Sequence, residues 1–162
     1  MPTAILIALI GVLIVVFFQD YRKRTIHAIL PITIFLLGLY LNYSSSDLEF
    51  IFMIYNIGFV VINITGLVLY FSIKHKAIVN PIDTFIGLGD IVFFIAITPL
   101  FSLKPFILFF ILGLLFSLLI HGVFTLIKEM KTIPLAGYLS LFLILHIVLK
   151  DILKINVPLS WQ

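Results

Sequence analysis

The feature that most constrains the fold is a series of six long apolar segments separated by short polar connections. Each has about 17–25 residues, the length that an α-helix needs to cross the hydrocarbon core of a bilayer. The segments are Thr3–Gln19, Ile26–Tyr43, Leu48–Ile73, Phe85–Phe101, Pro105–Ile127 and Ile133–Leu149. Their apolar residues are continuous rather than alternating, which favours helices over the strands of a membrane β-barrel. The sequence therefore predicts an all-α, polytopic membrane protein of six transmembrane helices.

The composition agrees with a lipid environment for nearly the whole chain. Of the 162 residues, 63% are hydrophobic and 10% are charged, against about 45–50% and about 25% in soluble domains. No stretch has the composition of a hydrophilic domain, so we expect one integral membrane domain over residues 1–162. The first segment lacks the positive region and the cleavage site of a signal peptide, and is interpreted as a retained helix.

Several kinds of site are excluded or disfavoured by residue content. The chain has no cysteine, which excludes disulfides, thiolate metal sites and cysteine nucleophiles. The four histidines lack the spacing of a metal site. No basic patch with interleaved aromatic residues indicates nucleic-acid binding. We therefore expect no metal, no cofactor and no nucleic-acid partner.

The basic residues predict the orientation in the membrane. Seven of the ten lysines and arginines fall in the first, third and fifth connections: Arg22, Lys23, Arg24, Lys74, Lys76, Lys128 and Lys131. We expect the protein to lie in the inner (plasma) membrane. By the positive-inside rule, these connections face the cytoplasm and both termini face the outer side. The connection Arg22–Arg24 is expected to bind anionic lipid and to fix this topology.

Two of the seven acidic residues stand apart from the polar connections. Asp20 closes the first segment at its cytoplasmic end, and Asp90 lies inside the fourth segment, about one turn below the same face. An acid inside a span costs about 2.5–3.5 kcal/mol on insertion scales, which makes a functional role the default interpretation. If the two carboxylates meet in a poorly hydrated site, they can share a proton and act together on a water molecule and a carbonyl group.

Asn56 and Asn63, seven residues apart on one helix face, are expected to form interhelical hydrogen bonds.

These residues resemble the type IV prepilin peptidases, membrane aspartic proteases with a Gly-x-Gly-Asp motif. Three places carry the resemblance: Asp20-Tyr-Arg-Lys-Arg-Thr-Ile26, Gly87-Leu88-Gly89-Asp90 and Ile133-Pro134-Leu135-Ala136-Gly137. It implies catalytic roles for Asp20 and Asp90, and substrate contacts for Gly87, Gly89 and Pro134. The implied substrate is a prepilin-like membrane protein, cut at the cytoplasmic face. The cysteine-containing N-terminal domain of larger members has no counterpart here, so N-methyltransferase activity is not expected.

Three residues depart from the family pattern, and the segment Leu135-Ala136-Gly137 is a loose fit to the family's third motif. His27 and Ala28 stand where the family has Pro-Asn, and Val92 stands where bacterial members often have lysine. These departures leave open a noncatalytic relative that binds pilin-like helices. A small ion- or proton-coupled transporter that uses Asp90 is a third possibility.

Overall fold

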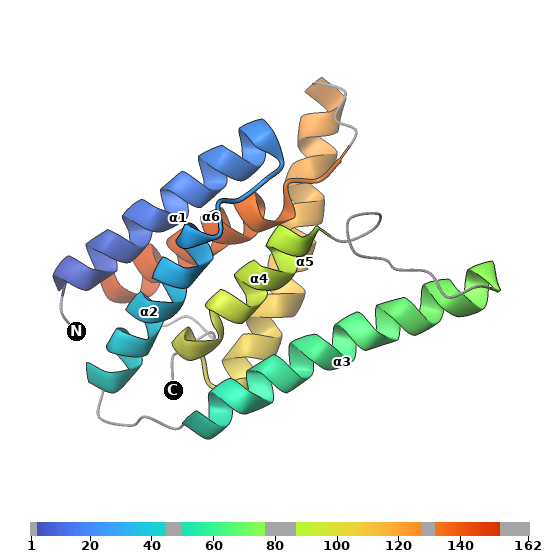
Figure 1. Cartoon of the computed structure of the whole chain (residues 1–162). Coiled ribbons are helices and arrows are strands. Elements are labelled where there is room, and N and C mark those ends of the chain that lie inside the picture. The colour runs from blue at the N-terminus through green and yellow to red at the C-terminus, as the bar shows by residue number, and fades with distance from the viewer. Residues whose placement is uncertain (1–2, 45–49, 77–86, 128–131, 153–162) are drawn as a thin grey trace.

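The computed structural model describes residues 3–44, 50–76, 87–127 and 132–152. These residues form six α-helices and no strand, which confirms the all-α fold class (Figure 1). The helices are α1 (Thr3–Lys23), α2 (Ile29–Ser44), α3 (Phe50–His75), α4 (Leu88–Ala96), α5 (Leu103–Ile127) and α6 (Leu135–Ile147). A short 3₁₀ helix, η1 (Thr98–Leu100), follows α4, and a π-helical turn, η2 (Val148–Ile152), follows α6.

The apolar lengths agree with a membrane protein but divide the helices into two groups. Within the described residues, α1, α3 and α5 are long and apolar enough to cross a bilayer. The apolar helices Ile29–Tyr43, Leu88–Leu100 and Leu135–Lys150 are shorter. The sequence predicted six full-length helices, and the clearest difference is the fourth, Phe85–Phe101. Its regular α-helix has nine residues and ends at Ala96.

Pro99 explains why α4 is short. A proline lacks a backbone N–H and disfavours helical geometry at the preceding residue, so helical bonding stops before it. The freed carbonyl groups are bonded by asparagines from other helices. Asn56 in α3 donates to the carbonyl oxygens of Thr98 and Phe101 at 3.1 and 2.7 Å, and Asn42 in α2 donates to that of Pro99 at 3.1 Å. These hydrogen bonds satisfy backbone carbonyl groups that lie outside a regular α-helix, in an apolar interior where water cannot bond them.

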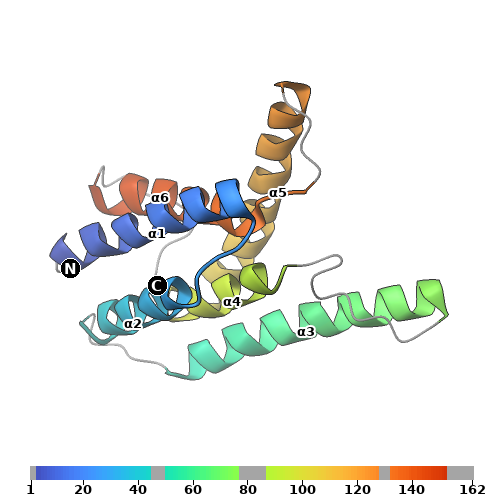
Figure 2. The same cartoon turned by 45° about the horizontal axis from the view of Figure 1, so that its top comes forward.

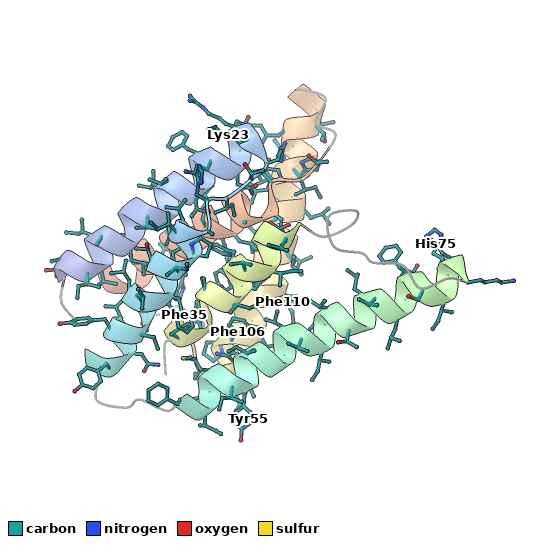
Figure 3. The ribbon with its side chains drawn as sticks, in the orientation of Figure 1. Lys23, Phe35, Tyr55, His75, Phe106 and Phe110 are labelled. Carbon is teal, nitrogen blue, oxygen red and sulfur yellow. The ribbon has the colours of Figure 1, made fainter. Side chains whose placement is uncertain are left out.

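Asn56 thus makes the interhelical bonds that the sequence predicted. Asn63 does not, because its side chain donates to the carbonyl oxygen of Phe59 in its own helix at 2.8 Å. The prediction for Asn63 was therefore wrong. The physical reason is that α3 diverges from the other helices beyond Val60, so that only Asn56 and Val60 are buried on it. Figure 3 shows the His75 end of α3 far from the remaining helices.

Helix α6 lies at the centre of the packing. It runs antiparallel beside α1 and also contacts α4 and α5, as Figures 1 and 2 both show for α1. Eight of its thirteen residues are buried. Helix α1 contributes a narrow stripe of buried residues to this packing. Helix α2 packs against α1, α4 and η1. The beginning of α6 is thereby brought against the end of α1.

Candidate active site

Asp20 is placed by the same stripe that packs α1 into the core. The buried residues of α1 are Leu6, Leu9, Leu13, Val16 and Asp20. Their spacing of three and four residues keeps them on one helix face. Asp20 is the last member of this stripe and is only 6% exposed. Its carboxylate therefore points toward α6 rather than toward the surface.

Asp90 is the third residue of α4, directly after the motif glycines. Gly87 is the N-cap residue of α4 and has an extended backbone. A Cβ atom built on Gly87 would lie 3.0 Å from Oδ2 of Asp90, so the carboxylate turns back over this glycine. A negative charge in the first turn of a helix is also favoured by the helix dipole.

The beginning of α6 binds both carboxylates. The amide of Ala136 donates to Oδ1 of Asp90 at 2.8 Å, and the amide of Gly137 donates to Oδ2 of Asp20 at 2.7 Å. The first-turn amides of a helix have no partner within the helix, and they carry the positive end of its dipole. Two acids from separate helices are thus held by consecutive amides of a third.

This arrangement fixes how far apart the acids can be. Consecutive amide nitrogens of a helix are roughly 3 Å apart, so Oδ2 of Asp20 and Oδ1 of Asp90 lie within about 9 Å. The two carboxylates are close enough to interact electrostatically. Nothing in the sequence forces the two aspartates together, but the fold does. Both acids therefore lie together at the beginning of α6.

A cavity of about 820 Å³ opens at this pair. Asp20, Asp90, Gly87 and Gly89 line it, together with residues from the α1–α2 connection and from α5. Its lining also includes Leu114, Leu118, Ile133 and Leu135. Its volume falls in the range of ligand pockets, about 300–1,000 Å³. The cavity therefore combines a mostly apolar wall with two carboxylates.

The predicted substrate-contact residues take different positions. Gly87 and Gly89 line the cavity, and a Cβ atom on Gly89 would lie 3.4 Å from Cδ1 of Ile26. Pro134 does not line it, but is the N-cap residue of α6, just before the amides that hold the acids. Of the residues that depart from the family pattern, Ala28 and Val92 line the cavity.

The sequence did not single out the amides of Ala136 and Gly137. Backbone amides have no residue signature, so only position can reveal them. The available signal was Pro134, since a proline at the start of a helix is followed by amides that lack helical partners. In the described ranges, no group of three or more His, Asp or Glu side chains comes together as a metal site.

The fold and site together define a class: a helical membrane protein with two acids held at one helix N-terminus. A sequence model of the type IV leader peptidase family matches residues 7–122, more than two thirds of the chain. The chain belongs to this family, which confirms the resemblance to prepilin peptidases. The match includes Asp20, Asp90 and the glycine motif, and ends before α6. Neither a curated protein nor a solved structure matches the chain in the same comparisons.

Proposed function

We propose that this protein is an aspartic endopeptidase that removes the leader of prepilin-like precursors, with Asp20 and Asp90 as its catalytic pair. The observation that carries the proposal is the hydrogen bonding of both carboxylates to consecutive amides at the beginning of α6. Family membership supports a peptidase with prepilin-type substrates. Neither N-methyltransferase activity nor a cofactor is part of the proposal.

The proposed chemistry needs one proton shared between the two acids. The ionised carboxylate takes a proton from a water molecule, and the resulting hydroxide adds to the peptide carbonyl carbon. The protonated carboxyl group gives its proton to the carbonyl oxygen, which yields a neutral tetrahedral diol. The diol then collapses: the carboxyl group that took the proton from water gives it to the leaving nitrogen, the other carboxylate takes a proton from a diol hydroxyl, and the C–N bond breaks. The released products are a carboxylic acid and an amine.

The basic residues at the ends of two helices support an orientation of the protein in the membrane. Arg22 and Lys23 end α1, and Lys74 and His75 end α3. By the positive-inside rule, these ends face the cytoplasm, and Asp20 lies at the same end of α1. The proposed site therefore cuts precursors at the cytoplasmic face of the plasma membrane, where a leader joins its apolar helix.

The test uses the purified full chain and a precursor with a short basic leader ahead of an apolar helix. Asp20→Asn and Asp90→Asn preserve shape but remove acid–base function, so each is expected to lower the cleavage rate by at least about 10²–10⁴-fold. Asp47→Asn is the matched control, because the sequence places Asp47 in an outer connection. Full cleavage by either site variant would remove the assignment.

A noncatalytic relative is the second candidate, and one observation favours it. Ala28 and Val92 line the cavity, at positions where the family resemblance implies asparagine and, often in bacterial members, lysine. This candidate predicts that the wild-type protein binds the precursor without cutting it. A transporter would instead show ion flux in liposomes that Asp90→Asn abolishes.

A further inference from the structure

Arg24 differs from its two basic neighbours in where its side chain lies. Arg22 and Lys23 are exposed, and Lys23 points away from the molecule in Figure 3. Arg24 is partly buried and lines the cavity that contains Asp20 and Asp90. It also interacts electrostatically with Asp20. The three residues, expected to act together on lipid, are therefore separated by the fold.

The backbone of Arg24 has the conformation that favours glycine. Its φ is 57°, and its amide donates to the carbonyl oxygen of Asp20 at 3.0 Å, which closes the end of α1. Glycine is the usual residue at such a helix end, because other residues are strained there. Lys76 has φ 51° after the end of α3, but it is exposed. Arg24 is thus distinguished by its partial burial and its place in the cavity lining.

The guanidinium of Arg24 has an N–H donor group that is not hydrogen-bonded within the described residues. Its Nη1 nitrogen is buried and makes no hydrogen bond within the described residues. A guanidinium offers five N–H donors and no acceptor, and buried donors are normally paired. An oxygen acceptor brought by a ligand would complete this arrangement.

The charge balance among Asp20, Asp90 and Arg24 indicates which kind of oxygen acceptor the ligand supplies. An aspartate pair that shares one proton carries one negative charge, and Arg24 supplies one positive charge beside it. A further carboxylate would leave the site with excess negative charge, whereas a peptide carbonyl adds none. We propose, resting on the proposed function, that Arg24 binds the substrate: its guanidinium donates to a backbone carbonyl oxygen of the precursor beside the scissile bond. This contact orients the bond against Asp20 and Asp90.

The test compares Arg24→Gly with Lys76→Gly. Glycine suits the backbone at both positions, so neither change should lower the thermal unfolding temperature. Binding of a labelled precursor peptide without acidic residues is measured in a sugar detergent, where neither carboxylate nor lipid phosphate competes. The Asp90→Asn background blocks cleavage. We expect Arg24→Gly to raise Kd by about 10- to 100-fold, the effect of losing a charged hydrogen bond, and Lys76→Gly to leave Kd unchanged.

Each outcome either supports or overturns the substrate-binding role of Arg24, and it can be told apart from failure of the proposed peptidase function. An unchanged Kd in Arg24→Gly overturns the inference, as does an effect that appears only with acidic peptides or in anionic vesicles. A raised Kd at an unchanged unfolding temperature supports it. If wild-type protein does not cut the precursor but Arg24→Gly still weakens binding, the proposed function fails while the binding role stands.

Discussion

The amide of Gly137 donates to the carboxylate of Asp20 at 2.7 Å across 117 positions of the chain. This one bond joins the end of α1 to the beginning of α6. The neighbouring amide of Ala136 does the same for Asp90 in α4. The candidate site is therefore assembled from three helices, and α6 supplies backbone amides to it.

Gly137→Ala tests how closely α6 must approach Asp20. The added Cβ atom would lie 3.2 Å from Oδ2 of Asp20 and 3.4 Å from the carbonyl oxygen of Phe17. We expect the beginning of α6 to move away from α1, with lower cleavage and a loss of about 1–3 kcal/mol in unfolding free energy from overpacking. Cleavage assays and unfolding in detergent measure both effects.

The control for that change is Gly11→Ala in α1. A Cβ atom at Gly11 has no other atom within 4 Å. Alanine favours a helix over glycine by up to about 1 kcal/mol, so stability should hold or rise and cleavage should be unaffected. Equal cleavage by the Gly137→Ala and Gly11→Ala proteins would contradict a close-contact role for Gly137.

The two motif glycines should differ in their response to alanine. At Gly87 the new Cβ atom would lie 3.0 Å from Oδ2 of Asp90, so the carboxylate must rotate or shift. At Gly89 the nearest atom is Cδ1 of Ile26, at 3.4 Å, which can adjust slightly. We expect Gly87→Ala to reduce kcat/KM well below the value for Gly89→Ala. The reverse order would show that substrate access at Gly89, rather than the position of Asp90, sets the need for glycine.

The aspartate pair should respond to mutation as one unit. General acid–base catalysis contributes about 10²–10⁴-fold, and both acids act in the same steps. We expect Asp20→Asn and Asp90→Asn each to lower kcat by at least that factor, and the double variant to be no slower than the slower single one. Single-turnover kinetics with sensitive detection of the product checks this. Multiplying effects would mean that the two acids work independently.

Asn56 and Asn63 form a matched pair for a stability prediction. Asn56→Leu removes both hydrogen bonds to the carbonyl groups of Thr98 and Phe101, next to the break after α4. Buried acceptors that lose donors cost about 1–3 kcal/mol. Asn63→Leu removes one exposed bond within α3, so it should change unfolding free energy by no more than about 0.5 kcal/mol. Similar losses in the two variants would refute the role given to Asn56.

Much of the fold could be predicted because lipid requires long apolar helices. The starts and ends of α1, α3 and α5 lie within a few residues of the predicted segments. The fourth segment was predicted too long, because apolar composition continues through Pro99 while helical hydrogen bonding does not. The acids and glycines of the motif were predicted from residue type and position. Their roles in catalysis and substrate binding stay predictions.

The sequence by itself determined that the chain is helical, that it belongs in a membrane, and which two acids are unusual within its apolar segments. Only the tertiary structure decided which face of each helix points inward, because helices that are apolar on every side carry no pattern to tell a buried face from a lipid face. That choice places Asp20 on the buried stripe of α1, places Arg24 in the cavity lining and brings the amides of α6 to both carboxylates. Packing between helices distant in sequence, rather than local pattern, assembles the site.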